Sequence, residues 1–257
     1  MKSQSLYIVC AGLLLTGSIS VVAFPGEEFN PFPPDARPEQ IAVHEIPRTI
    51  ERNQEGEFER LVFQGSVDGH EITMWMSEDE SDLMVDGESK FPDKSGGCGG
   101  SPFFSLYAGD LNQDGILDFL LNHWQGGNGW AAGGATLTFI LSAGETHQTA
   151  SVLAHYVWEE NFVMLDGKPC FIHTSTGIAG NTELQAREHY YVHNIVVIDG
   201  AKLRVDNSLY PGFPMLQSAY VMSDREGLTE ESRTVLDGMA EEHKEELRQK
   251  ALKEIFL

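Results

Sequence analysis

The sequence predicts a mainly β protein of antiparallel sheets, arranged as a sandwich or as partial-propeller hairpins, with one C-terminal α-helix. Three observations support this fold class. Short apolar or alternating runs bounded by turn residues follow one another over residues 56–222. Asp-Gly pairs join some of these runs, which is typical of hairpins. The last part of the chain instead has apolar residues at steps of four, which indicates a helix.

Length and charge limit the possible functions. The chain has 257 residues, of which 41% are hydrophobic, so it can bury a substantial core. Its formal net charge is −22, from 17 Lys and Arg against 39 Asp and Glu. Nucleic acid and anionic membrane surfaces need a positive patch and are therefore not expected partners. A protein or a glycan ligand remains open.

Residues 1–23 predict a cleaved signal peptide. Lys2 precedes the apolar run LYIVCAGLLL, and Val21 and Ala23 suit a signal-peptidase site. The run is shorter than the roughly 20 residues that cross a bilayer, so no stable membrane insertion is expected after cleavage. A lipid anchor at Cys10 is disfavoured because Val9 stands where a small residue is expected. The predicted location is secreted or periplasmic.

Residues 24–55 predict a proline-rich tether ahead of the β-domain. Five of the eleven prolines fall within residues 24–40, among mixed charges and without apolar periodicity. Such a composition lacks backbone donors and favours an extended segment. We therefore expect the folded domain to cover residues 56–222.

Two hairpins stand out within the predicted β-domain. The runs ERLVFQGSV and HEITMWMS are joined by Asp68-Gly69, and HYYVHNIVVI continues through Asp199-Gly200 into AKLRV. Further strands are expected at PFFSLYA, DFLLN, ATLTFILS, SVLAHYVW, NFVML and PCFIHTS. The acidic stretch SEDESDLMVDGE, residues 77–88, is expected to be a solvated loop.

Residues 223–257 predict one amphipathic helix, spanning 229–256. Thr229 is a suitable N-cap, and the lysines near the C-terminal end interact favourably with the helix dipole. The apolar positions at steps of four are Val235, Met239, His243, Leu247, Ala251 and Ile255. This stripe could dock a partner or pack on the β-domain, and its ordinary width favours the second interpretation.

The stretch DLNQDGILD, residues 110–118, predicts a calcium site. Its oxygen-bearing side chains are Asp110, Asn112, Asp114 and Asp118. Calcium prefers six to eight oxygen ligands, and this loop offers three carboxylates and one amide. An EF-hand is disfavoured, because Leu121 replaces the required glutamate and both flanks look like strands. A turn rich in Asp and Asn without metal is the alternative.

With its flanks, this stretch resembles the integrin α-type repeat, also called FG-GAP or VCBS-like. The likeness covers residues 108–142, where DFLL matches the repeat's apolar strand and GGNGWAAGG its glycine-rich connection. The resemblance implies a calcium loop between two strands of a propeller blade. It also implies side-chain ligands from Asp110, Asn112, Asp114 and Asp118, and a carbonyl ligand from Ile116. Only one copy of the loop is found, so a standard propeller with repeated blades is not expected.

Two further pairs of residues suggest sites. Cys98 and Cys170 are the cysteines left after signal cleavage, and an even pair in an exported chain predicts a disulfide. Trp124 and Trp130 flank the glycine-rich QGGNG beside the calcium loop. They could stack on a sugar or clamp a peptide, and core packing is the alternative.

Evidence for an enzyme is weak. The chain has no G-x-S-x-G motif, and Ser101 and Ser175 lack its context. A triad could still assemble in space from His173 with Asp166 or Glu188.

His189 and His193 have the spacing of a helical metal pair, but they belong to a predicted strand. Four strand residues separate their side chains by roughly 13 Å, too far for one zinc ion.

The calcium loop and the export signal together favour calcium-stabilised binding or structural work outside the cytoplasm. A secreted hydrolase with a site built from the histidine-bearing strands is the alternative.

Overall fold

The fold class predicted from the sequence is confirmed. The computed structural model describes residues 30–90, 103–124, 134–144, 146–154, 159–181, 186–223 and 241–256. These residues form three antiparallel sheets and one C-terminal helix, α2 (Glu241–Glu254). Among the residues described, no helix is both long and apolar enough to span a membrane. The predicted signal peptide lies outside the described residues.

Sheet C is a meander of consecutive strands. Its strands are β3 (Arg48–Arg52), β4 (Phe58–Val67), β5 (His70–Met76), β6 (Ser81–Val85) and β7 (Glu88–Ser89). The predicted hairpin at Asp68-Gly69 is confirmed, and both residues adopt positive φ angles of 52° and 87°, as a tight hairpin turn requires. The prediction of a solvated loop at residues 77–88 is wrong, because these residues form a turn, β6 and the start of β7. Alternate residues of β6, Ser81, Leu83 and Val85, are buried.

Sheet B lies beside it and includes the predicted calcium hairpin. In spatial order its strands are β11 (Thr146–Ala154), β10 (Ala135–Ala143), β9 (Asp118–Trp124), β8 (Phe104–Gly109) and β2 (His44–Ile46). The predicted strands PFFSLYA, DFLLN, ATLTFILS and SVLAHYVW correspond to β8, β9, β10 and β11.

Sheet A forms the third layer. Its strands are β1 (Glu39–Gln40), β12 (Phe162–Leu165), β13 (Lys168–Asn181), β14 (Ala186–Asp199), β15 (Lys202–Val205) and β16 (Met215–Ser223), the last paired with β14. Asp199 pairs with Lys202, so the hairpin loop is Gly200-Ala201, one residue later than the predicted turn. Strand β16 was not among the predicted strands.

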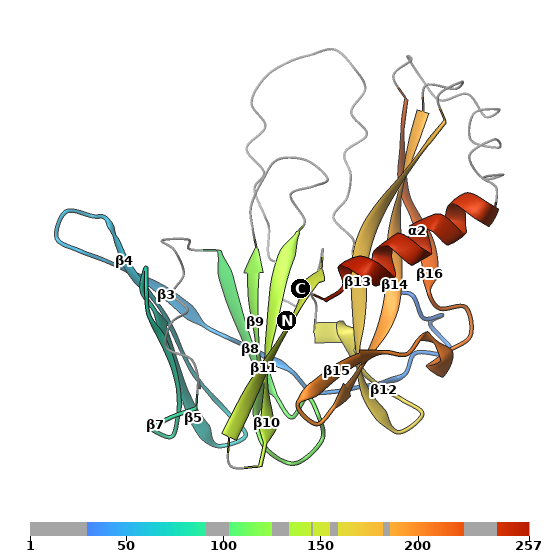
Figure 1. Ribbon diagram of the computed structural model, residues 1–257. Coiled ribbons are helices and arrows are strands. Elements are labelled where there is room, and N and C mark those ends of the chain that lie inside the picture. The colour runs from blue at the N-terminus through green and yellow to red at the C-terminus, as the bar shows by residue number, and fades with distance from the viewer. Residues whose placement is uncertain are drawn as a thin grey trace.

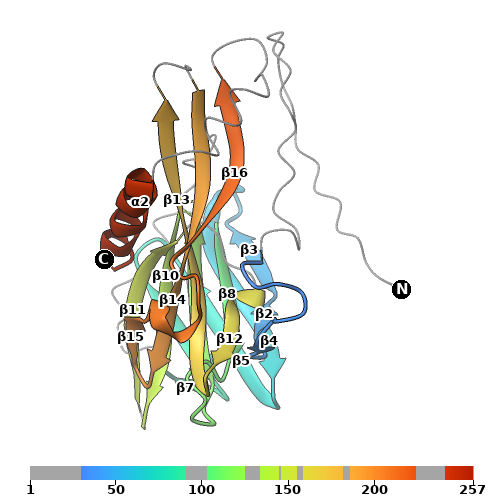
Figure 2. The same ribbon diagram turned by 90° about the vertical axis from the view of Figure 1, so that its right-hand side faces the viewer.

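The three sheets are layered in the order C, B, A, from left to right in Figure 1, and their long strands run lengthwise in Figure 2. One apolar core fills the space between sheets C and B, and another fills the space between B and A. Neighbouring residues of β10 point into different cores: Phe139 towards sheet A and Ile140 towards sheet C. Sheet B is buried on both faces, which explains the nearly continuous apolar runs DFLL and TFIL.

The predicted tether needs correction over residues 30–55. This segment contributes β1, β2 and β3, one strand to each of the three sheets. Phe32 is 3% exposed and packs against Tyr210 and Phe213 on the outer side of sheet A. The extended conformation of residues 30–55 was expected. The three short strands nevertheless pair with β12, β8 and β4, so the segment is part of the folded domain.

Helix α2 packs on its own β-domain, as favoured from the sequence. It lies along β13 and also contacts β14 and β16 (Figures 1 and 2). Ala251 is buried, and so is Ile255, which follows the last residue of the helix and joins the core between sheets A and B. Leu247 comes so close to Gly177 that a Cβ there would lie 3.0 Å from a leucine methyl carbon. The predicted start of the helix falls in residues 224–240, outside the described residues.

Candidate calcium-binding loop

The acidic loop connects β8 to β9 as the turn of an antiparallel hairpin, in agreement with its predicted position. Gly109 and Asp118 are the last paired residues before the loop. Gly115 has a φ of 86°, and no atom lies within 4 Å of the position its Cβ would occupy. Glycine is therefore required there by backbone conformation rather than by lack of space.

Short-range hydrogen bonds order the loop. Asp110 accepts bonds from the backbone N–H groups of Asp114 (3.0 Å, to Oδ1) and Gly115 (2.9 Å, to Oδ2). Asn112 Oδ1 also accepts from the Asp114 N–H, at 3.1 Å. Asp114 Oδ1 accepts from the N–H of Ile116 at 2.9 Å. These Asx-type bonds fold the chain around its own carboxylates.

Asp118 joins the loop to the neighbouring strand β10. Its side chain is 0% exposed. Its Oδ1 accepts from the Ser142 N–H at 2.6 Å, and its Oδ2 accepts from the Asn112 N–H at 3.0 Å. One carboxylate therefore stabilises both the start of β9 and the end of β10.

Ser142 is a site residue that the sequence did not indicate. It is 1% exposed, and its hydroxyl donates to Asp114 Oδ2 at 2.6 Å. Asn112 Nδ2 donates to the same hydroxyl at 2.8 Å. Ser142 lies 24 positions or more from every residue of the loop, so no local spacing could have identified it.

Burial raises the pKa of Asp118 to about 6. Loss of hydration is the largest cause, and the nearby Asp114 raises the pKa further. The hydrogen bonds from Ser142 and Asn112 act in the opposite direction, because they stabilise the charged form. The hydrogen bonds from these neutral groups therefore do not fully offset the free-energy cost of burying the ionised carboxylate.

The donor set fits a hard cation in its chemistry. Carboxylate, amide and hydroxyl oxygens are the ligands that calcium prefers. Both Asp110 oxygens and Asp114 Oδ1 retain a second lone pair beyond their hydrogen bond, whereas Asp114 Oδ2 accepts from both Ser142 and Asn112. The side chains are, however, turned towards N–H and O–H donors. Over the part of the chain that the structure describes, no three Asp, Glu, His or Cys side chains converge as a metal site. Ile116, the predicted carbonyl ligand, is 41% exposed.

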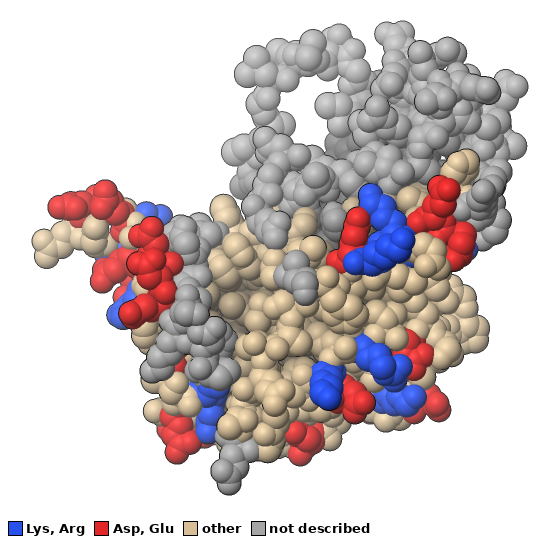
Figure 3. Space-filling view, viewed as in Figure 1, with Lys and Arg blue, Asp and Glu red and all other residues tan. Residues whose placement is uncertain are grey.

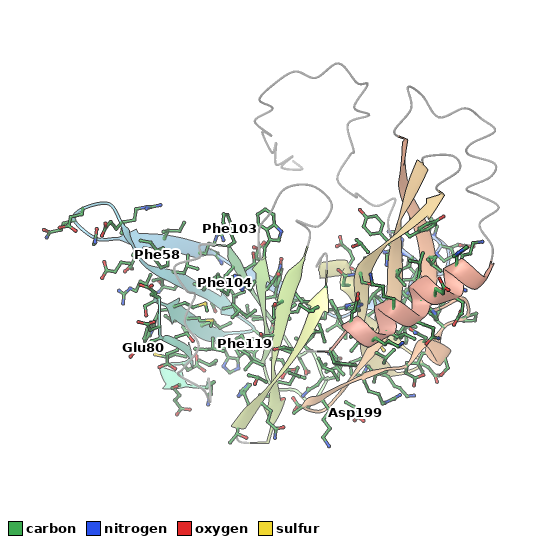
Figure 4. All side chains as sticks on the ribbon, turned by 45° about the horizontal axis from the view of Figure 1, so that its top comes forward. Phe58, Glu80, Phe103, Phe104, Phe119 and Asp199 are labelled. Carbon is green, nitrogen blue, oxygen red and sulfur yellow. The ribbon has the colours of Figure 1, made fainter. Side chains whose placement is uncertain are left out.

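The predicted aromatic surface lies at the other end of β9. Trp124 is 40% exposed and contacts Phe103 edge to face, with ring centroids 5.3 Å apart. Figure 4 shows Phe103 at the end of sheet B away from the more central Phe119. The seven residues of β9 separate Trp124 from Asp118 by roughly 20 Å. Trp130 lies outside the described residues.

Cys170 is a buried cysteine on β13 with no disulfide partner among the described residues. Its side chain is 0% exposed, and its Sγ donates to the carbonyl of Lys168 at 3.4 Å. Burial raises its pKa to about 11, so the thiolate is disfavoured. Cys98 lies outside the described residues, and the disulfide between the two stays a prediction.

The histidine-bearing strands are β13 and β14, as predicted. His193 is 2% exposed; its Nε2 lies 3.1 Å from Gln217 Oε1 and its Nδ1 lies 3.0 Å from Thr174 Oγ1. The Ser175 hydroxyl donates to the carbonyl of Val192 at 3.5 Å. Among the described residues, the His193 ring therefore bonds to an amide and a threonine hydroxyl and to no carboxylate. Ser101 and the side chains of Glu188 and His189 lie outside the described part.

Comparisons of the chain with protein-family models, with curated proteins and with solved structures found no match. The resemblance of residues 108–142 to the integrin α-type repeat therefore rests on the motif alone.

Proposed function

We propose that this chain is an exported calcium-binding β-domain protein with a non-enzymatic, structural or ligand-binding role. The observation that carries the proposal is the fully buried Asp118 carboxylate within an oxygen-rich loop. Its hydrogen-bond partners are neutral groups, and burial disfavours its charged form. A cation held beside Asp118 would supply the missing positive charge.

Calcium suits this loop better than zinc or magnesium. The loop offers oxygen ligands rather than the nitrogen and sulfur that zinc prefers. Magnesium requires nearly ideal octahedral geometry, whereas calcium accepts a flexible shell completed by water. Asp110, Asn112, Asp114 and Asp118 would supply side-chain oxygens, and Ile116 a carbonyl. The bound ion would reduce repulsion among the three carboxylates.

The proposed ion has a structural role. Asp118 and Ser142 already connect the ends of β9 and β10, and Asp114 reaches the same serine. Calcium in the loop would strengthen these connections at one end of sheet B. The exposed Trp124 and Phe103, roughly 20 Å away at the other end, would remain available for a glycan or peptide ligand. The apolar N-terminal run of the sequence supports export.

Calorimetric titration of calcium into the purified chain tests this proposal. We expect a dissociation constant of about 10⁻⁴ to 10⁻³ M, the weak range of extracellular calcium modules. Asp114→Asn should abolish the binding heat while largely preserving the shape of the loop.

The matched control is Asp79→Asn, which removes the same charge from the exposed turn between β5 and β6. This variant should bind calcium as the wild type does. Equal binding heats in wild type and Asp114→Asn would refute the calcium site.

A further inference from the structure

A pocket of about 500 Å³ lies where the turns of sheets C and B meet. One wall comes from the turn at Asp68, the β6–β7 turn and Lys90. The facing wall comes from the acidic loop and from His147 at the start of β11. These hairpin ends lie towards the bottom of Figure 1. Two separate sheets therefore form the pocket together.

The charge of the pocket is strongly negative. Its four carboxylates belong to Asp68, Asp86, Glu88 and Asp110, and Lys90 is the one lysine or arginine among its described lining residues. On the face shown in Figure 3, charged side chains gather mainly on the hairpin turns and helix α2, around a broad area of other residues. The pocket is thus a local concentration of the chain's overall negative charge.

Three of the four carboxylates have partners. Glu88 Oε2 accepts from Lys90 Nζ at 2.9 Å, and Asp86 Oδ2 lies 2.7 Å from His70 Nδ1. Asp110 accepts from N–H groups of its own loop. The Asp68 carboxylate has no hydrogen-bond or ion-pair partner among the described residues. It is therefore available to a ligand from solution.

His147 belongs to the wall that the acidic loop forms. It lines the pocket and is only 8% exposed. Its Nε2 bonds to the Leu117 carbonyl at 3.0 Å, but its Nδ1 has no hydrogen-bond partner within the described structure. This nitrogen is shielded from solvent, so His147 contributes the edge of its ring to the wall rather than a hydrogen bond to a ligand.

The remaining lining is apolar. Val85, Ile116 and Leu117 lie among the charged residues, and Ile116 is 41% exposed. A ligand that matches both features carries a positive head on a short aliphatic stem. Lysine and arginine side chains and small aliphatic amines have this character, with an apolar stem and a charged tip. The partly buried Lys90 already places such a group beside Glu88.

We propose that this pocket binds an ammonium or guanidinium group on an aliphatic stem. The cationic head would lie near Asp68, Asp86 and Glu88, and the stem against Ile116 and Leu117. The ligand could be a basic side chain of a polypeptide or a free aliphatic amine. This site is separate from the Trp124 surface. The carboxylates proposed for the cationic head belong to sheet C and not to the calcium loop, although Asp110 lines the pocket as well.

Calorimetric titrations of the purified chain with three probes test the proposal. The probes are N-acetyl-arginine amide, its neutral isostere N-acetyl-citrulline amide, and 1,4-diaminobutane. We expect saturable binding of the arginine probe and at least about tenfold weaker binding of the citrulline probe, because only arginine carries the charge. Binding of diaminobutane as well would indicate a free amine, and binding of arginine alone would indicate a basic side chain of a polypeptide.

Three variants locate the binding site. Asp68→Asn should weaken binding about fivefold by removing one nearby charge, and asparagine tolerates the positive φ of 52° at this position. Lys90→Gln should strengthen binding about threefold, because it removes an internal competitor. Asp79→Asn, on the opposite turn of sheet C, should leave the affinity unchanged. Melting temperatures would verify that each variant is folded.

Equal affinities for the arginine and citrulline probes would overturn the proposal, as would unchanged affinity in both folded variants, Asp68→Asn and Lys90→Gln. Parallel titrations in calcium and in EDTA separate this inference from the proposed calcium function. Amine binding without calcium binding would refute only the calcium site. Calcium binding without amine binding would refute only this pocket.

Discussion

Sheet A and the acidic loop of sheet B each bury one ionisable side chain, and burial favours the neutral form of each. The environment satisfies the neutral form at one site but leaves a charge at the other. His193 in sheet A is 2% exposed, and burial lowers its pKa to about 4. Asp118 in sheet B is 0% exposed, and burial raises its pKa to about 6. At neutral pH the histidine is therefore uncharged, whereas the aspartate still carries most of its charge.

The difference follows from the available partners. Gln217 Oε1 can only accept, so His193 Nε2 carries the proton and Nδ1 accepts from the Thr174 hydroxyl. A neutral imidazole thus satisfies both of its nitrogens without a charge. Asp118 accepts from two backbone N–H groups, and no lysine or arginine pairs with it among the described residues. The comparison indicates why a positive ion would stabilise the loop and would contribute nothing at His193.

The largest expected effect comes from removing the Asp118 carboxylate. Asp118→Ala leaves the N–H groups of Asn112 and Ser142 without their acceptor. Each unsatisfied buried donor costs about 1 to 3 kcal/mol, so we expect a loss of about 4 kcal/mol in the free energy of unfolding. Urea denaturation at pH 5 measures this loss with little contribution from the cost of burying the charge.

Asp110→Ala is the control within the same loop. It also removes an acceptor of two N–H bonds, but these belong to exposed loop residues that water can reach. Its expected cost is about 1 kcal/mol. Equal losses for the two variants would contradict the special role of the buried carboxylate.

The second effect is a loss of stability in acid caused by His193. Its pKa is about 4 in the folded state, below the ordinary value of 6.5. The unfolded chain therefore binds more protons between these values, and stability falls as pH decreases from 6.5 towards 4. The expected contribution is about 3 kcal/mol. The unfolding free energy of the wild type minus that of His193→Gln should therefore fall by this amount as pH decreases from 6.5 to 4; a constant difference would disprove the assignment.

Asp118 should show a smaller dependence of the opposite sign. Its folded pKa of about 6 lies above the ordinary 3.8. The folded chain binds the extra proton, so this stabilisation is fully present below pH 3.8 and is lost as pH rises through 6. We expect about 3 kcal/mol in metal-free protein over the whole range, of which about 2 kcal/mol falls between pH 4 and 7. Unfolding of wild type and Asp118→Asn from pH 4 to 7 measures it, and calcium should diminish it at pH 7. A wild-type curve parallel to that of Asp118→Asn would exclude this titration.

Local patterns predicted most of the long strands, because these pair with a sequence neighbour. The exception is β16, which pairs with β14 and was not predicted. The hairpins β4–β5, β8–β9 and β10–β11 follow from alternating or apolar runs and their turns. The same reasoning failed for residues 30–55. Strands of two to five residues carry little pattern of their own and form because an edge of another sheet is available. That edge depends on tertiary packing.

The candidate site was predictable in part for the same reason. The acidic positions of residues 110–118 are a local signal, and the hairpin that carries them was expected. Ser142 reaches the loop only because β10 pairs with β9. The pocket acids Asp68 and Asp86 come from turns of another sheet, so their proximity to Asp110 depends on how two sheets pack. Sequence spacing contains no information on such packing.

The C-terminal residues after α2 have a consequence for solubility. Strand β11 is the outer strand of sheet B, and such a strand offers unpaired backbone groups to other molecules. Here the Leu153 N–H donates to the Ile255 carbonyl at 2.9 Å, and Val152 forms a bridge with Phe256. This short segment covers the C-terminal end of the exposed edge, at Val152 and Leu153. A second copy of the chain therefore cannot extend sheet B there, and release of these residues would open a route to self-association without unfolding of the three sheets.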